Sequence, residues 1–186
     1  MMNEISLQSE LSRHLIIKEF AAWTALSALR SGSPVKDRVR VYGIIHRIDF
    51  NEVLSGSRPI SQAEFDTWHK QVVEVIATEL SLCVGWCVKI VNVYLKTTSY
   101  IGDLGRPGLR EVIHPPIDGI LWKAVEKGYA GNQNILSLTH SKRLIKDIET
   151  YADYQKIISG LKLVSTELAC TLFEVEQLWQ KNESTV

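Results

Sequence analysis

The sequence predicts an all-α fold, a single compact helical domain of about six or seven helices. Apolar residues recur at three- and four-residue spacing over most of the chain, which is the period of a helix. Capping residues stand before several of these stretches. No repeats, low-complexity segments or clear linker divide the 186 residues, so we expect one domain, 1–186, with one core.

The N-terminal half supplies the first helices of this prediction. A helix is expected over residues 7–30, ended by the Ser-Gly-Ser-Pro sequence at 31–34. Residues 35–53 have a β-rich composition in part, yet their apolar positions repeat at helical spacing, so we expect helix there. A loop follows at 54–59. Ser61 and Glu64 then form a capping box, which predicts a helix over 62–82.

The C-terminal half is predicted from its glycines and prolines. Gly85 is expected to begin a new helix, and the glycine- and proline-rich segment 101–116 a loop. A short helix should follow Pro116 over 117–127, and a second loop should span 128–137. We expect Thr139 or Ser141 to cap a helix ending near residue 159, and Gly160 to separate it from a final helix, 161–181.

Composition excludes several classes of protein. Lys plus Arg and Asp plus Glu number 21 each, which argues against a general polyanion binder but leaves room for a local basic surface. The three cysteines have no spacing typical of a disulfide framework or a zinc site, so we predict neither metal nor cofactor. With no secretory N-terminus and no apolar run of membrane-spanning length, we expect a cytoplasmic protein without membrane contact.

One polar stripe runs along the otherwise apolar helix that begins at Gly85. Lys89, Asn92, Lys96 and Ser99 follow Gly85 at offsets of 4, 7, 11 and 14 residues, which places all five on one helical face. A lysine on such a helix is held against apolar surface. Desolvation there favours the neutral amine, which is a nucleophile.

The sequence His114-Pro115-Pro116-Ile117-Asp118 predicts a rigid turn that brings a carboxylate to a helix start. The helix dipole stabilises negative charge at that position. Lys89 and Asp118 are therefore the predicted catalytic pair, within a motif region that spans residues 61–127.

Together these motifs resemble a known family. Gly85-x-x-x-Lys89 at the start of an apolar helix, followed by Pro116-Ile117-Asp118 at the start of a later one, resembles the helix–hairpin–helix DNA glycosylases with a Gly/Pro-rich loop and a catalytic Asp. The resemblance is greatest to the 8-oxoguanine glycosylase branch and its archaeal forms. It covers residues 85–122, and Cys87 stands where the family has its second hairpin glycine.

The resemblance implies a DNA base-excision glycosylase and abasic-site lyase, with DNA as partner. The damaged base would be flipped out of the duplex. Lys89 would attack the sugar and form a Schiff base, while Asp118 would stay ionised and support the attack. The residues expected to stack on the base are Trp86, Trp122 and Trp68. Those expected to bind the nucleic acid are Asn92, Lys96, Arg106, Arg110, His114 and Lys123.

Each of these residues also has a structural explanation, which the sequence leaves open. Lys89 and Lys96 can be the solvated side of a core helix. Asp118 has an alternative, purely structural role at the start of a helix, where Asp is favoured in any case. Tryptophans spaced through helices are most often core residues.

Two other functions compete with the glycosylase. Arg40 and His46, six residues apart, resemble the Arg–His pair of HEPN-type ribonucleases, in which the histidine acts as acid and base and the arginine binds phosphate. The third hypothesis is a non-enzymatic helical interaction protein. Its evidence is an apolar stripe near the C-terminus, which is either core or the seam of a homodimer: Leu168, Leu172, Val175 and Trp179.

Overall fold

Helices make up all the regular structure of the computed structural model, which describes residues 4–29, 32–35 and 37–179. The predicted all-α class is confirmed, and within these ranges the helices outnumber the six or seven expected. The larger group of elements contains α1 (Glu4–Ser27), α2 (Arg38–Arg47), α3 (Asn51–Leu54), α4 (Gln62–Leu80), α5 (Val84–Leu95), the π-helix η1 (Lys96–Ile101) and α6 (Leu109–Val112). The smaller group contains α7 (Gly119–Gly128), α8 (Gln133–Thr139), the 3-10 helix η2 (Ile145–Asp147), α9 (Tyr151–Leu168) and the 3-10 helix η3 (Phe173–Trp179).

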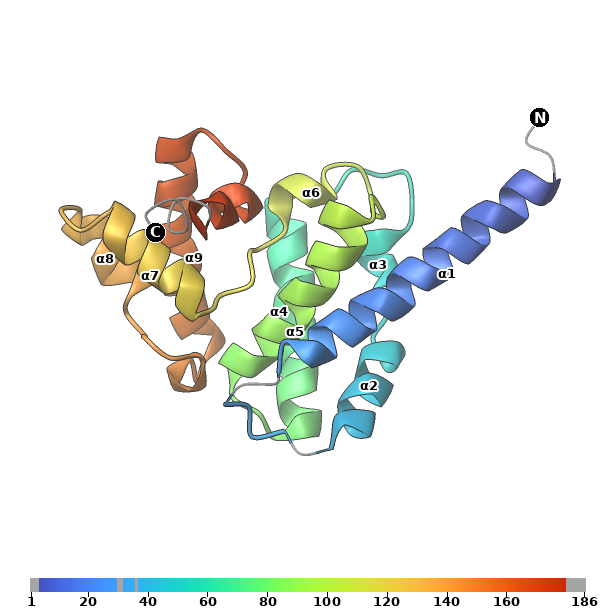
Figure 1. The fold of residues 1–186 in the computed structure, drawn as a ribbon, viewed down its shortest axis with the longest axis horizontal. Coiled ribbons are helices and arrows are strands. Elements are labelled where there is room, and N and C mark those ends of the chain that lie inside the picture. Colours follow the sequence, from blue (N-terminus) through green and yellow to red (C-terminus); the bar gives the residue numbers. More distant parts are fainter. Residues whose placement is uncertain (1–3, 30–31, 36, 180–186) are drawn as a thin grey trace, which may run out of the picture.

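The helix α5 lies at the centre of the molecule. It packs against α1 and α4 of the larger group and against η2 and α9 of the smaller one. Ile90, Val91 and Leu95 are fully buried, as a helix that is apolar on nearly every side requires. The two groups lie side by side, and the extended segment 113–118 connects α6 to α7 (Figure 1).

Local capping sets the start of several helices. The Ser61 hydroxyl accepts a hydrogen bond from the backbone N–H of Glu64, which begins α4 as predicted. The Glu64 carboxylate does not return a bond to Ser61, because it pairs with Arg58 and Arg106 instead. Of the two hydrogen bonds of the predicted capping box, only the one accepted by Ser61 therefore forms. The Glu64 carboxylate forms ion pairs instead.

The C-terminal third differs most from the predicted elements. The helix α8 occupies part of the expected loop 128–137. The next helix does not begin at Thr139 or Ser141, because the true capping box is formed by Thr150 and Asp153. This helix, α9, continues through Gly160 and ends at Leu168, so the predicted final helix 161–181 is wrong. The predicted helix ends at residues 30 and 181 lie outside the described parts of the chain.

Close packing explains why glycine is found at position 160. A Cβ atom there would lie 2.6 Å from Cγ2 and 2.9 Å from the backbone nitrogen of Thr139, at the end of α8. Gly160 therefore allows α8 to pack directly on α9 and does not break the helix.

The C-terminal apolar stripe belongs to the core. Leu172 and Val175 are 5% and 0% exposed, and Leu168 and Trp179 are partly buried against the same cluster. The expected dimer seam is therefore already covered within one copy of the chain. Among the described helices, none combines the length and the apolar character that crossing a bilayer requires.

The first prediction concerns Gly160. Gly160→Ala should lower the free energy of unfolding by about 1–3 kcal/mol, because the added methyl group overlaps α8. Gly43 in α2 is the matched control, since its Cβ position meets only a long side chain at 3.9 Å. Gly43→Ala should be neutral or stabilise by roughly 0.5–1 kcal/mol. Urea denaturation of both variants measures the difference, and equal effects would show that α8 does not pack as described.

Candidate functional site

The two residues of the predicted catalytic pair border the same cavity, whose volume is about 510 Å³. Lys89 comes from α5 and Asp118 from the start of α7. We call it the Lys89–Asp118 cavity, and its lining residues are Gly32, Trp86, Lys89, Asp118, Gly119, Trp122, Arg143, Leu144, Ile145 and Lys146. This volume lies within the range of small-ligand sites.

Burial and charge act in opposite directions on Lys89. Its half-buried position lowers the pKa of the amine, and this is the largest effect. The negative charge of Asp118 raises that pKa through space, although the two side chains form no direct ion pair. The ammonium nitrogen also lies 5.6 Å from the centre of the Trp86 ring, a contact that favours the charged form. Burial outweighs the Asp118 charge, so the pKa of Lys89 is lowered and the amine loses its proton more readily than an exposed lysine.

Asp118 caps α7 with one of its two carboxylate oxygens. Oδ1 accepts hydrogen bonds of 2.9 Å from the backbone N–H groups of both Ile120 and Leu121. No described residue donates a hydrogen bond to Oδ2. The carboxylate thus has the capping role that its position suggested, and its orientation is fixed while one oxygen remains for a ligand.

A buried amide fixes the segment that carries Asp118. Asn92 lies on the same face of α5 as Lys89, one helical turn further along, and is fully buried. Its Nδ2 donates to the carbonyl oxygen of Pro115 at 3.0 Å and to the Tyr154 hydroxyl at 2.9 Å. Because Pro115 is held against α5 in this way, Asp118 lies beside the part of α5 that carries Lys89.

The hydrogen bonds around Asn92 indicate which ring nitrogen carries the proton in two buried histidines. Since Oδ1 of Asn92 can only accept, Nε2 of His69 donates to it at 2.8 Å. The Tyr154 hydroxyl accepts from Asn92 and therefore donates to Nδ1 of His114 at 2.9 Å. Nε2 of His114 then donates to the Asp66 carboxylate at 3.0 Å. Every member has a partner, so this network forms a rigid polar core between α4, α5 and α9.

The segment 143–148 completes the cavity, and sequence reasoning missed it. The N–H of Gly85 donates to the carbonyl oxygen of Ile148 at 2.9 Å, and a Cβ at Gly85 would lie 1.9 Å from the carbonyl oxygen of Ile145. Gly85 is thus needed for this close approach. Its amide is occupied and cannot bind a phosphate as a hairpin glycine does. The same segment brings the exposed side chains of Arg143 and Lys146 to the cavity.

Three of the predicted nucleic-acid contacts are wrong, because their side chains are internal. Asn92 and His114 belong to the buried network and are 0% and 2% exposed. Arg106 is 8% exposed and pairs with the Glu64 carboxylate while donating to carbonyl oxygens in the segment 52–59. These arginine and histidine side chains organise the protein's own loops.

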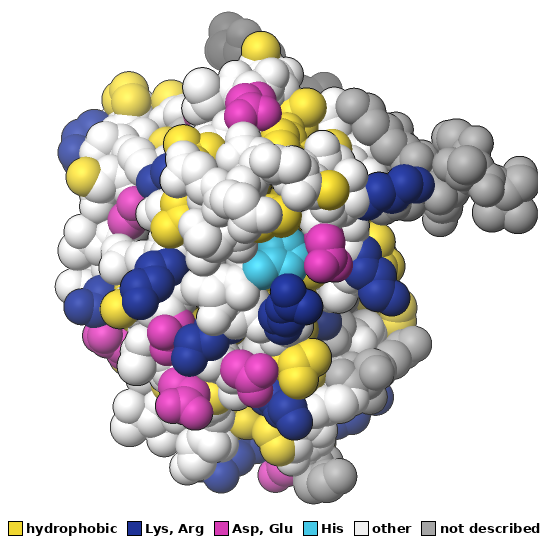
Figure 2. All heavy atoms as spheres, turned by 90° about the vertical axis from the view of Figure 1, so that its left-hand side faces the viewer, with side chains coloured by type: hydrophobic (Ala, Val, Ile, Leu, Met, Phe, Trp, Pro, Cys, Tyr) yellow, Lys and Arg dark blue, Asp and Glu magenta, His cyan; other side chains and the backbone are white. Residues whose placement is uncertain are grey.

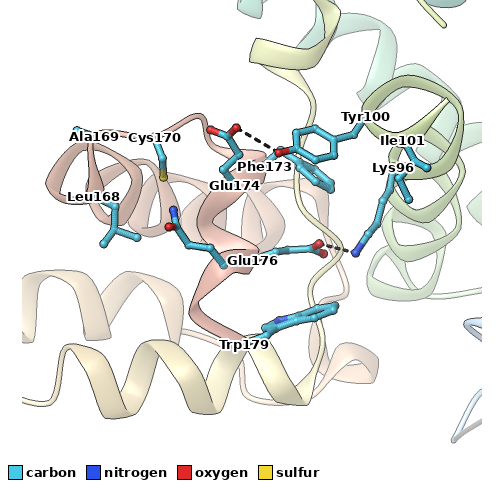
Figure 3. A pocket seen from close by; sticks show the side chains of 11 residues that line it. Lys96, Tyr100, Ile101, Leu168, Ala169, Cys170, Phe173, Glu174, Glu176 and Trp179 are labelled. Atoms are coloured by element: carbon cyan, nitrogen blue, oxygen red, sulfur yellow. Dashed lines mark hydrogen bonds and ion pairs between the residues drawn. The ribbon is translucent and has the colours of Figure 1, made fainter. Parts of the chain in front are cut away.

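Lys96 points into a different cavity, of about 660 Å³, between η1 and η3. Figure 3 shows its ammonium group reaching across to the carboxylate of Glu176. The nitrogen also lies 4.6 Å from the ring centre of Trp179 and 5.7 Å from that of Phe173. Lys96 therefore neutralises a buried carboxylate and does not border the Lys89–Asp118 cavity.

The remaining two predicted contacts lie outside the cavity lining. Arg110 donates to the carbonyl oxygens of Ser99 and Tyr100 near the end of η1 and pairs with Asp103. Lys123 is exposed on α7, directly after Trp122. Of the six predicted contacts, only Lys123 is both exposed and without an ion pair among the described residues.

Two of the three predicted aromatic residues line the cavity. Trp86 and Trp122 are 5% and 7% exposed, and the Trp122 ring is fixed because its Nε1 donates to the carbonyl oxygen of Thr139 at 2.9 Å. Trp68 instead packs in the core, 5.8 Å from the ring centre of Phe50. The prediction that Trp68 stacks on a base is therefore wrong.

The two residues of the rival Arg–His pair each bond to a different part of the chain. Arg40 donates to the carbonyl oxygen of Glu79, at the end of α4. His46, on the same helix, lies 3.8 Å from the Glu19 carboxylate of α1. The two side chains contact different neighbours within one copy of the chain.

No protein-family model matches the chain, and no curated protein or solved structure is significantly similar to it. The site therefore has to be judged on its own geometry. On the face formed by the smaller group, basic and acidic side chains are interspersed and neither sign dominates (Figure 2). The cavity differs locally, because its lining includes Lys89, Arg143 and Lys146 but a single carboxylate, Asp118.

A second prediction follows from the opposing effects on Lys89. Competitive labelling with an amine-specific reagent over a pH series should show Lys89 reacting at lower pH than a small-molecule alkylamine used as internal standard. Asp118→Asn keeps a good helix cap but removes the charge that raises the Lys89 pKa, so that pKa should fall further. An unchanged or raised pKa in this variant would mean that the two groups do not face each other.

A third prediction concerns His69, whose burial lowers its pKa from 6.5 to about 3. Between these values the unfolded chain binds a proton that the folded chain does not. The contribution of His69 to the free energy of unfolding is therefore fully present above pH 6.5. It decreases as the pH falls below that value, by at most about 1.4 kcal/mol per pH unit. His69→Gln should flatten the pH dependence of the free energy of unfolding between pH 3 and 6.5, measured by urea denaturation.

Proposed function

We propose that the chain binds nucleic acid at the Lys89–Asp118 cavity and acts there as a DNA base-excision glycosylase and abasic-site lyase. The observation that carries this proposal is the shared cavity itself. An amine with a lowered pKa and a carboxylate with one unoccupied oxygen border one cavity, whose lining also includes Trp86 and Trp122. The lining has more cationic side chains than carboxylates, which suits an anionic ligand.

The cavity residues have the chemistry that this reaction needs. The neutral amine of Lys89 attacks the anomeric carbon of a flipped nucleotide, and the bond to the base breaks with its electron pair leaving on the base. Asp118 stabilises the positive charge that develops on the sugar and accepts the proton that the amine releases. The sugar ring then opens to a Schiff base with Lys89. Loss of a proton from the neighbouring carbon expels the 3′ phosphate.

The rim cations supply the binding that such a reaction requires. Arg143 and Lys146 are exposed and reach the cavity from the segment before α9. Phosphate contacts from these side chains hold the backbone on either side of the flipped nucleotide. They replace the contacts that the sequence assigned to Asn92, Arg106 and His114.

Borohydride trapping tests the reaction. Incubation with duplex DNA that contains one abasic site, followed by reduction, should give a covalent protein–DNA adduct on a denaturing gel. Lys89→Gln should abolish the adduct, because no imine forms without the amine. Lys123→Gln is the matched control, an exposed lysine on α7, and should retain it. Asp118→Asn should slow base release from an 8-oxoguanine duplex by about 10²-fold or more.

Two outcomes would contradict the proposal. Absence of any adduct with the native chain on both substrates would remove the lyase. An adduct that persists in Lys89→Gln, with an unchanged circular dichroism melt, would assign the reaction to another amine.

A further inference from the structure

Two cations at the Lys89–Asp118 cavity have no acidic partner. Arg143 and Lys146 are exposed and line the cavity, and neither forms an ion pair or a side-chain hydrogen bond with another described residue. By contrast, Lys96 in the other large cavity pairs with the Glu176 carboxylate. An arginine and a lysine that are free to donate are the side chains that phosphate groups bind most often in proteins.

The local structure holds these two cations close to α5. Lys146 belongs to η2, which packs on α5, and Arg143 lies on the segment that enters η2. The hydrogen bond from the N–H of Gly85 to the carbonyl oxygen of Ile148 fixes this contact. A phosphate bound by the two cations is therefore held at the same cavity that Lys89 and Asp118 border.

Much of the remaining lining is apolar or aromatic. Trp86 and Trp122 are nearly buried, and Leu144 is an apolar side chain that stays 51% exposed at the cavity. The volume of about 510 Å³ lies in the range of sites that enclose one small organic molecule. The lining therefore fits a small ligand that has a flat or apolar part next to its phosphate group.

The two lysines of the lining differ in their exposure. Lys146 is exposed, whereas Lys89 is half-buried, and this burial lowers the pKa of its amine. A neutral amine adds to the electrophilic carbon of an aldehyde. Asp118 has one carboxylate oxygen to which no described residue donates, so it is able to carry protons during such a reaction.

We propose that the cavity binds a small phosphorylated aldehyde, which forms an imine with Lys89 while Arg143 and Lys146 bind its phosphate group. This inference rests on the reactive amine of the proposed function. It goes beyond that function, because the ligand is a free small molecule and not a nucleotide within DNA. An abasic site offers the same combination of aldehyde and phosphate, so the experiment compares the two sources.

The reaction is a condensation that releases water. The lone pair of the Lys89 nitrogen forms a bond to the aldehyde carbon, and the electron pair of the carbonyl bond moves to its oxygen. Asp118 carries one proton from the nitrogen to that oxygen, which gives a carbinolamine. It then carries the second proton of the nitrogen to the same oxygen. Water leaves with the electron pair of the C–O bond as the C=N bond forms.

Labelling with pyridoxal 5′-phosphate, a single aromatic ring with an aldehyde and a phosphate, tests the proposal. The native chain should give a saturable imine absorbance, and reduction with borohydride should fix the label at Lys89, as located by peptide mass spectrometry. Lys89→Gln should lose this label. The probe 5-deoxypyridoxal lacks the phosphate and should need a concentration about 10-fold higher or more for half-maximal labelling.

The contribution of the cations is tested by the preference for the phosphorylated probe. Arg143→Gln/Lys146→Gln should remove most of that preference. The matched control Lys123→Gln/Lys127→Gln loses the same charge at two exposed lysines of α7, outside the cavity lining, and should keep it. Inorganic phosphate provides a test without a variant. It should slow the labelling of Lys89 in the native chain by pyridoxal 5′-phosphate and not by 5-deoxypyridoxal.

Three results would overturn the proposal. The label would spread over exposed lysines and persist in Lys89→Gln, the two probes would label the native chain equally well, or the control pair would lose the preference as fully as the cation pair. Labelling of Lys89 by the free probe without an adduct to abasic DNA would support this inference and remove the lyase. An adduct to abasic DNA without labelling by the free probe would do the opposite.

Discussion

The arrangement of this molecule depends on one buried amide. Asn92 lies in the middle of α5, a helix enclosed by apolar neighbours, and leaving its polar atoms unpaired would cost roughly 1–3 kcal/mol for each group. Its partners come from three separate parts of the chain: His69 of α4, Pro115 of the connecting segment and Tyr154 of α9. Satisfying this side chain therefore joins the two groups of helices and sets where α7 begins.

The candidate site follows from that constraint. Since Pro115 is tied to α5, the carboxylate that caps α7 reaches the cavity that Lys89 borders. Asp118 meets a structural and a chemical requirement together, because capping uses one oxygen and holds the other in place. The pKa of Lys89 is decided by which effect is larger, and burial outweighs the Asp118 charge. The site therefore positions an amine without a direct ion pair that would keep it protonated. The Lys89–Asp118 cavity is defined by titratable groups, by nearby cations and by two tryptophans in its lining.

Local patterns in the sequence determined the all-α class, the start of α4 at Ser61, the cap of α7 at Asp118 and the helical face that carries Lys89. These features depend on neighbours within one or two turns, which the sequence displays directly. The exposure of a polar residue depends on partners that are remote in the chain. Asn92 and His114 looked like ligand contacts for this reason, and only the fold revealed the partners that bury them. Gly85 and Gly160 follow the same rule, since a glycine suggests a break locally, whereas the approach of residues 145 and 139 decides its role.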